Sequence, residues 1–285
     1  MNNFTARTIT CLSLAFTVII CLVLSRWALA AAFLVVVILG LNEFYNLATT
    51  DHVKPQKYFG IVAGALWFIS YALIAVIPNS LFNFFHSGAG FLMAFIPIIL
   101  LFLVPINEIF RNEANPLMNV ACTWFGLLYI PLSLACLIVP ANNIAPEFHG
   151  IPAILLGYFL LVWFYDTGAY LVGSRFGKHK FFERISPKKT WEGTIAGVVI
   201  AFLTAIGLSF IITVVSLTDW LILTGIIILC GTAGDLFESL IKRSLHIKDS
   251  GSLLPGHGGI LDRFDTVFIS APFVFVFYIV RLYYL

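Results

Sequence analysis

Long apolar runs separated by short polar segments dominate this chain. A helix needs about 20 residues to cross the roughly 30 Å hydrocarbon core of a bilayer. Nine runs suit such a crossing: residues 8–25, 27–47, 59–78, 88–108, 117–140, 151–173, 193–216, 219–241 and 266–284. The alternating ten-residue segments of a membrane barrel are absent from the sequence. The pattern predicts an all-α, polytopic helical membrane protein with about nine transmembrane helices.

The first two runs are separated only by residues 25–27. They therefore form either a tight helical hairpin or one bent element. The first run also has the outline of a secretory signal, with Arg7 before an apolar stretch and Ala28-Leu29-Ala30 after it. Its apolar stretch is longer than the roughly 7–15 residues usual in such signals and leads almost directly into the next run, which favours a retained helix.

Composition narrows the class of protein. Hydrophobic residues make up 60% of the chain and charged residues 11%, whereas about 25% of an ordinary soluble domain is charged. All five cysteines lie inside apolar runs, without the spacing of zinc ligands or of a disulfide framework. They are Cys11, Cys21, Cys122, Cys136 and Cys230. We expect them to be small buried side chains in helices.

The positions of lysine and arginine predict the orientation in the membrane. With nine spans, 14 of the 16 Lys and Arg residues fall on the side of the N-terminus, and only Arg26 and Arg281 fall on the other side. Basic residues concentrate on the cytoplasmic side of membrane proteins. We therefore expect a cytoplasmic N-terminus and a C-terminus that faces outward.

The two halves of the chain differ in chemical character. Up to about residue 150 the loops are short and plain, whereas the basic loops and the charges within the sixth and eighth runs come later. We divide the chain into residues 1–150, five spans with a structural role, and residues 151–285, four spans that carry the function with their cytoplasmic loops. Because the first half carries no evident chemistry, it is available as the interface of a homodimer.

The eighth run carries one polar helical face. Its residues recur at positions i, i+3, i+4 and i+7: Asp235, Glu238, Ser239 and Lys242. A charge at the bilayer centre costs about 2.5–3.5 kcal/mol on insertion scales, so we expect this face to line a cavity. Gly231 and Gly234 leave room for a neighbouring helix or a ligand. The alternative is a helix-packing patch in which Asp235 is paired with Lys or Arg.

A second candidate region is residues 166–193, DTGAYLVGSRFGKHKFFERISPKKTWEG. Asp166 lies near the cytoplasmic end of the sixth run, and the segment 186–190 leads into the seventh run at Trp191. Helix starts favour Ser, Thr and Pro, and they attract phosphate through unsatisfied N–H groups. The region therefore indicates phosphate binding. The alternative for residues 175–184 is a basic loop that sets the topology and contacts anionic lipid.

A third candidate region is residues 239–265, SLIKRSLHIKDSGSLLPGHGGILDRFD. Its ionisable groups stand between two apolar runs, so they belong at a membrane surface or in a cavity open to water, where a polyanion and metal ions can be held. Gly258 and Gly259 permit backbone geometries that present N–H groups to an anion. Carboxylates such as Asp235 and Asp262 suit magnesium. The alternative is an ordinary turn that ends at a helix N-cap.

The third region resembles the integral-membrane phosphatidate cytidylyltransferases of bacteria, also called CDP-diglyceride synthases. Their pattern S-x-x-K-R-x4-K-D-x-G-x2-L-P-x-H-G-G-x-x-D-R-x-D is matched without departure from Ser239 to Asp265. The segments 166–170 and 186–193 are similar to the preceding motifs of that family. The resemblance implies the reaction of CTP with phosphatidate to give CDP-diacylglycerol and pyrophosphate.

The resemblance also implies roles for individual residues. The catalytic residues would be Asp235, Asp262, Lys242, Arg263 and His257. The substrate-binding residues would be Asp166, Ser186, Lys188, Lys189, Thr190, Ser239, Arg243, Lys248, Gly258 and Gly259. One or two cations, Mg²⁺ first, would be held by Asp235 and Asp262, with Asp249 and Asp265 as second candidates. His257 either donates to a phosphate oxygen or orders its loop.

The implied partners are CTP, phosphatidate and membrane lipid, without nucleic acid. CTP arrives from the cytoplasm while phosphatidate keeps its acyl chains in the bilayer, so we expect a site that faces the cytoplasm, in a bacterial inner membrane. The alternatives within enzymes are a CTP-dependent lipid kinase and a cytidylyltransferase for another lipid phosphate. An anion transporter would also use intramembrane carboxylates, and a non-catalytic scaffold would need the basic residues alone.

Overall fold

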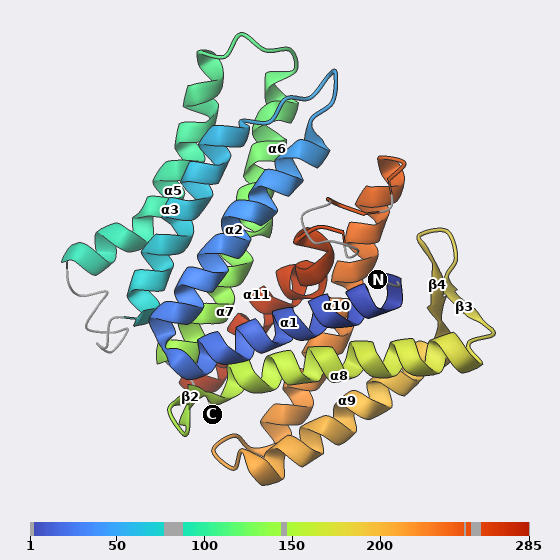
Figure 1. Cartoon of the computed structure of the whole chain (residues 1–285). Helices are drawn as coiled ribbons and strands as arrows, with labels where there is room; N and C mark the ends of the chain where they lie inside the picture. Colours follow the sequence, from blue (N-terminus) through green and yellow to red (C-terminus); the bar gives the residue numbers. More distant parts are fainter. Residues whose placement is uncertain (1–2, 77–87, 144–146, 248, 252–257, 285) are drawn as a thin grey trace. The chain divides into compact units, whose positions relative to one another are not determined.

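The computed structural model describes residues 3–76, 88–143, 147–247, 249–251 and 258–284 (Figure 1). The helices are α1 (Asn3–Leu24), α2 (Arg26–Ala48), α3 (Lys57–Val76), α5 (Gly88–Ile109), α6 (Pro116–Tyr129), α7 (Pro131–Asn143), α8 (Ala153–Phe176), α9 (Trp191–Ile211), α10 (Leu217–Ser244) and α11 (Leu261–Tyr284). The strands are β1 (Glu147–Phe148), β2 (Ile151–Pro152), β3 (Lys180–Phe182) and β4 (Ser186–Thr190).

Helices account for the predicted spans. Among the described residues, eight segments are long and apolar enough to cross a membrane, and the shorter apolar helix segment Ala15–Leu24 belongs to α1. The prediction of a polytopic helical membrane protein is confirmed. Helix α11 begins at Leu261 rather than at the predicted residue 266. Its first turn is charged, and a carboxylate there is favourable because the helix dipole is positive at that end.

The chain changes direction at Ser25, between α1 and α2 (Figure 1). Ser25 has an extended backbone, and its hydroxyl accepts a hydrogen bond from the N–H of Ala28 at 3.0 Å. This bond satisfies one of the free donors at the start of α2. Of the two expected arrangements, the structure has the bent one, with a helix cap at the bend.

The fifth predicted span is divided into α6 and α7. The division falls at Ile130-Pro131, because proline cannot donate the backbone hydrogen bond that continues a helix. The N–H of Leu134 still bonds to the carbonyl of Ile130 at 3.2 Å. The two helices together keep the length of one crossing, Pro116–Val139.

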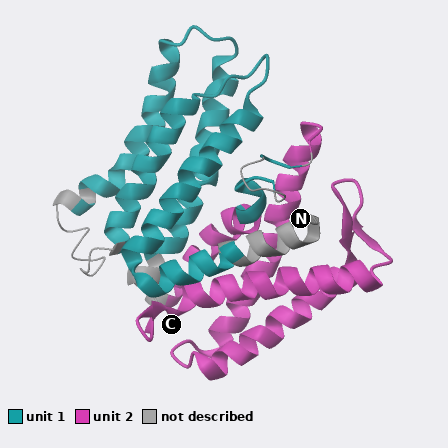
Figure 2. Ribbon diagram, in the orientation of Figure 1, with its two compact units in different colours: residues 1–143, 249–264 teal, residues 144–248, 265–285 magenta. Residues whose placement is uncertain are grey.

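The chain forms two compact units (Figure 2). Unit 1 comprises residues 1–143 and 249–264, and unit 2 comprises residues 144–248 and 265–285. The segment 249–264, which carries much of the third candidate region, thus belongs with the N-terminal helices. The functional division that the sequence suggests at residue 150 stays a prediction.

Unit 1 is held by a buried aromatic side chain and a buried polar network. Tyr45 is fully buried, and its hydroxyl donates to the carbonyl of Thr123 at 3.0 Å. Near the start of α3, the carboxylate of Glu108 accepts hydrogen bonds from Gln56 at 2.6 Å and Asn119 at 2.7 Å, and it pairs with Arg111 at 2.9 Å. The network satisfies a buried carboxylate that would otherwise be costly.

Unit 2 is built on close packing between helices. Glycines at 173 and 193 bring the backbones of α8 and α9 together, because a Cβ at Gly193 would lie 2.6 Å from the carbonyl oxygen of Ala169. Such contacts between small residues are typical of membrane helices. In the first turn of α10, Asp219 pairs with Arg281, which lies in the last turn of α11, at 2.6 Å. Two short hairpins, β1–β2 and β3–β4, join the helices; neither was expected from the sequence.

Candidate active site

Three carboxylates of unit 2 come from three different helices. They are Asp166 on α8, Asp235 on α10 and Asp265 on α11. Asp265 is close enough to the other two, and to Lys242, to interact with them electrostatically. Like charges repel, so a gathering of this kind needs compensating cations or protons. The structure thus brings together one principal metal candidate, Asp235, one secondary candidate, Asp265, and the predicted substrate-binding residue Asp166.

Glycines allow α10 and α11 to approach each other here. A Cβ at Gly234 would lie 2.5 Å from the carbonyl oxygen of Asp265, and a Cβ at Gly231 would lie 2.6 Å from the side chain of Thr266. The prediction that these glycines leave room for a neighbour is confirmed, and the neighbour is α11. The close approach places the backbone of Asp265 against the turn of α10 that precedes Asp235.

The polar face predicted for the eighth span exists. The carboxylate of Asp235 pairs with the ammonium of Lys189, and it accepts a long hydrogen bond of 3.5 Å from the hydroxyl of Ser239. Lys242 pairs with Glu238 at 3.3 Å, one turn apart on the same helix. Pairing of Asp235 with a lysine is what a helix-packing patch predicts. Its partner, Lys189, is itself a predicted phosphate-binding residue, so the pair is compatible both with helix packing and with a substrate site.

The β3–β4 hairpin carries the predicted phosphate-binding segment. Residues 186–190 form strand β4, and Thr190 caps α9 by accepting a hydrogen bond from the N–H of Gly193 at 3.3 Å. The predicted helix start at Trp191 is confirmed. Arg243 donates to the carbonyl of Ile185 at 3.3 Å, which ties the end of α10 to the turn of the hairpin. Lys188 is exposed.

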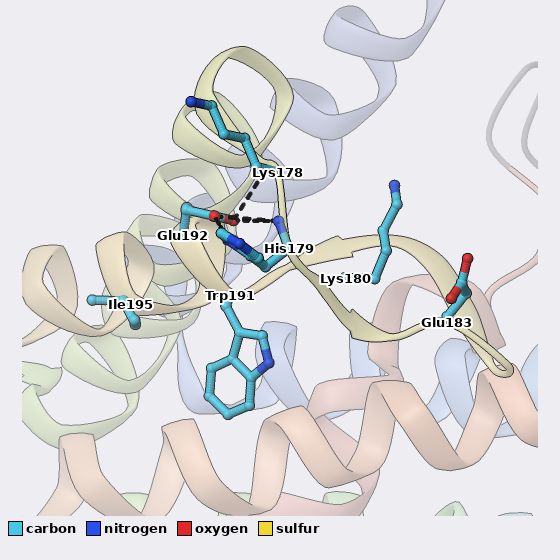
Figure 3. Close-up of a pocket in the computed structure, with 7 residues that line it drawn as sticks. All are labelled: Lys178, His179, Lys180, Glu183, Trp191, Glu192 and Ile195. Carbon is cyan, nitrogen blue, oxygen red and sulfur yellow. Dashed lines mark hydrogen bonds and ion pairs between the residues drawn. The ribbon is translucent and has the colours of Figure 1, made fainter.

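An open pocket lies at the root of this hairpin (Figure 3). The carboxylate of Glu192 accepts hydrogen bonds from the backbone N–H groups of Lys178 at 3.1 Å and His179 at 3.2 Å, and it lies 2.6 Å from Nδ1 of His179. The backbone N–H of Trp191 donates to the carbonyl of His179 at 2.9 Å. The pocket is lined by Lys178, His179, Lys180, Glu183, Trp191, Glu192 and Ile195. Glu192 therefore fastens the start of the hairpin to the start of α9.

In unit 1, the carboxylate of Asp262 is held by its own loop. One oxygen, Oδ2, accepts hydrogen bonds from the backbone N–H of Ser250 at 2.9 Å, the hydroxyl of Ser250 at 2.9 Å and the backbone N–H of Gly259 at 2.8 Å. Gly258 has a positive φ of 79°, which favours glycine at that position. Arg263 is exposed. Asp262 is the second residue of α11, and its carboxylate closes the turn that precedes this helix.

The sequence prediction missed a buried carboxylate that meets this loop. Glu43 on α2 is 4% exposed, and its Oε2 accepts a hydrogen bond from the backbone N–H of Leu261 at 3.0 Å. Glu43 lies inside the predicted run 27–47, and a carboxylate inside a predicted span is the feature that singles out Asp235. That argument, applied to the first half of the chain, would have found it.

Two predicted site residues, Lys248 and His257, lie outside the described residues. Among the residues that the structure describes, no three His, Cys, Asp or Glu side chains are grouped closely enough to hold a metal ion. The metal roles of Asp235 and Asp262, and of Asp249 and Asp265 after them, therefore stay predictions.

Known proteins resemble the chain over most of its length. A model described as "Cytidylyltransferase family" matches residues 5–281. Proteins named phosphatidate cytidylyltransferase are 42% identical over 165 residues in Staphylococcus haemolyticus and 42% identical over 174 residues in Haemophilus influenzae. These matches cover 57% and 58% of this chain and 58% of each relative. A third, from Rickettsia bellii, is 30% identical over 232 residues, 79% of this chain and 92% of the relative.

Proposed function

Because the chain belongs to the cytidylyltransferase family, we propose that it is a phosphatidate cytidylyltransferase, which converts CTP and phosphatidate into CDP-diacylglycerol and pyrophosphate. The names of the relatives support the substrates. The observation that carries the proposal is the ion pair between Asp235 and Lys189 of the hairpin, with Asp265 near enough to Asp235 and Asp166 to interact with them electrostatically. Carboxylates and cations at one place are what a reaction between two phosphates requires.

The chemistry is the attack of one phosphate on another. A phosphate oxygen of phosphatidate forms a bond to the α-phosphorus of CTP, and the bond from that phosphorus to the oxygen of the β-phosphate breaks, so pyrophosphate leaves with the electron pair. Phosphatidate is already an anion near neutral pH, so a strong general base is not required. The barrier comes from repulsion between two polyanions. Positioning and neutralisation of charge therefore dominate catalysis.

The basic residues of unit 2 supply the neutralising charge in this proposal. Lys189 and Lys242 each pair with a carboxylate of α10, and Arg243 is tied to the hairpin. Lys188 extends from the same strand as Lys189 and is exposed. Charge-assisted bonds from such groups to phosphate oxygens are short and strong. Ser186, Thr190 and Ser239 would add hydrogen bonds, and the same role is proposed for Lys248 and His257.

The proposed ligands carry oxygen donors of the kind that magnesium prefers. Asp235 presents a carboxylate that is 29% exposed, with Asp265 as a neighbour, and hard oxygen ligands of this kind suit Mg²⁺. In unit 1, Asp262 and then Asp249 are the proposed ligands. The ion would neutralise the charge of the pyrophosphate leaving group. The three hydrogen bonds to Oδ2 of Asp262 fix the direction of that carboxylate.

The proposed location is a bacterial inner membrane with the active site towards the cytoplasm. Support comes from the basic residues, 14 of which fall on the side of the N-terminus when the chain has nine spans, and from the membrane-length segments among the described residues. The bacterial relatives agree with this assignment. A homodimer through the first five spans stays part of the proposal.

The purified protein in detergent, given CTP and phosphatidate with and without magnesium, tests the function. We expect equal amounts of pyrophosphate and CDP-diacylglycerol, formed only with magnesium. Mass analysis of the lipid product separates the enzymatic alternatives, because a lipid kinase adds one phosphate whereas a cytidylyltransferase adds CMP. Product with another lipid phosphate but not with phosphatidate would change the substrate. No CTP consumption with any lipid would overturn the proposal in favour of transport.

A further inference from the structure

Glu43 lies in a part of the chain to which the sequence assigned no chemistry. It is on α2, one turn after Gly40, and only 4% of it is exposed. A buried carboxylate is costly unless hydrogen bonds or charges compensate it. The groups that surround it therefore indicate why it is there.

The carboxylate of Glu43 contacts the first residues of α11. Oε2 accepts the hydrogen bond from the backbone N–H of Leu261, the first residue of that helix. An N–H group in the first turn has no partner within the helix, and the helix dipole favours a negative charge beside it. The side chain of Leu261 is buried, and it packs near Gly40 of α2. The start of α11 is thus attached to α2 through one polar and one apolar contact.

The carboxylate of Glu43 also lies against two glycines of the third candidate region, residues 239–265. A Cβ at Gly251 would lie 2.7 Å from Oε1 of Glu43, and a Cβ at Gly259 would collide with Oε2. Both glycines are specified positions of the pattern found in the sequence. The approach of Glu43 leaves no room for a side chain at either position, and at Gly259 the hydroxyl of Ser250 lies equally close.

Gly259 also connects Glu43 to Asp262. Its backbone N–H donates to Oδ2 of Asp262 at 2.8 Å, while its Cα faces the carboxylate of Glu43. Residues 259–261 are therefore held between two carboxylates, one from α2 and one from the first turn of α11. Displacement of Glu43 would free the turn that directs the side chain of Asp262.

We propose that Glu43 is a positioning residue, which holds residues 259–261 so that Asp262 and Arg263 keep the orientation that the reaction needs. This inference rests on the proposed function for the part played by Asp262. It assigns a role in the active site to the N-terminal half of the chain. Partners of this kind, which orient a metal ligand or a catalytic group, typically change metal affinity or activity about 10–100-fold when they are removed.

Glu43→Ala tests the proposal with two measurements. Hydrogen exchange reports on the turn without any need for activity: we expect the amides of Gly259 and Leu261 to exchange at least about tenfold faster, because local opening becomes easier. In the enzyme assay we expect kcat to fall about 10–100-fold and the half-saturating magnesium concentration to rise. Exchange and kcat within about twofold of the unaltered protein would overturn the inference.

Glu108→Gln is the matched control. Glu108 is also a buried carboxylate of unit 1, but its partners are Gln56, Asn119 and Arg111. We expect this variant to unfold at a lower temperature, with unchanged exchange at Leu261 and unchanged magnesium dependence. The same changes in both variants would mean that Glu43 acts only through general stability, which overturns the inference.

Glu43→Asp decides the question if the alanine variant does not fold. Its carboxylate is one methylene shorter, so it keeps the charge but loses the contact with Leu261. Faster exchange and lower kcat in a folded Glu43→Asp variant support the proposal, and values equal to those of the unaltered protein overturn it. If the unaltered protein makes no CDP-diacylglycerol, the proposed function fails, while the exchange measurement still shows whether Glu43 holds the turn.

Discussion

The ammonium of Lys189 on β4 is paired with the carboxylate of Asp235 on α10. The two side chains are 28% and 29% exposed, and an ion pair that reaches solvent is worth only about 0–1 kcal/mol in stability. Stability is therefore a weak reason for this pair. A phosphate group can take Lys189 as its partner at little cost, which leaves the oxygens of Asp235 available to a cation.

Lys189→Ala should lower kcat/KM for CTP about 10²-fold, because a charge that stabilises the developing negative charge is removed. Lys188→Ala is the matched comparison on the same strand, and we expect a smaller loss, since Lys188 is exposed. Steady-state rates with both variants, measured at saturating phosphatidate, check the difference. Equal losses would mean that the two lysines act as a diffuse basic surface.

Asp235→Asn should remove nearly all turnover while the protein still inserts and folds. The asparagine keeps the shape of the side chain but loses the negative charge that would hold a cation. Asp219→Asn is the control on the same helix, where the aspartate pairs with Arg281. It should lower the unfolding temperature and leave turnover in place. Full activity of Asp235→Asn would refute the metal role of this residue.

The helix packing beside Asp235 gives a prediction about stability. Gly234→Ala places a Cβ against the backbone carbonyl of Asp265, and overpacking of this kind typically costs about 1–3 kcal/mol. Gly225→Ala is the control, because nothing lies within 4 Å of the added Cβ and alanine favours the helix. The temperature of thermal unfolding in detergent should fall for Gly234→Ala and stay equal or rise for Gly225→Ala. An unchanged unfolding temperature in Gly234→Ala would show that α10 and α11 are not closely packed.

The sequence predicts what depends on local pattern. Apolar runs gave the helices, and the spacing of Asp235 and Ser239 gave a polar face whose members contact each other. The glycines at 231 and 234 indicated a close neighbour, although the pattern could not tell a helix from a ligand. Each of these features follows from the period of a single helix.

Contacts between distant segments were not predictable in this way. The β3–β4 hairpin has few residues and little alternation, so the sequence pattern predicts a loop there. The convergence of Asp166 with Asp265 depends on how α8 and α11 pack in unit 2, which no local period reveals. The sequence pattern gives no role to Glu43, because a single carboxylate at the end of an apolar run is typical of a helix end. Its partners lie more than 200 positions away in the chain.

The root of the hairpin gives the last prediction. Glu192→Ala removes the acceptor of the backbone N–H groups of Lys178 and His179, so these amides should exchange faster with solvent. Strand β4 carries Lys189 towards Asp235, and a looser hairpin should therefore lower turnover about tenfold.

Glu183→Ala is the control for this change. Glu183 lines the same pocket (Figure 3). It belongs to the turn that joins β3 to β4, not to the root of the hairpin. Its removal should leave both the exchange of the two amides and the turnover unchanged. Faster exchange with full turnover in Glu192→Ala would mean that catalysis does not depend on the position of the hairpin and depends instead on Asp235 and α10. Slower turnover in both variants would instead indicate that the pocket itself contacts a substrate.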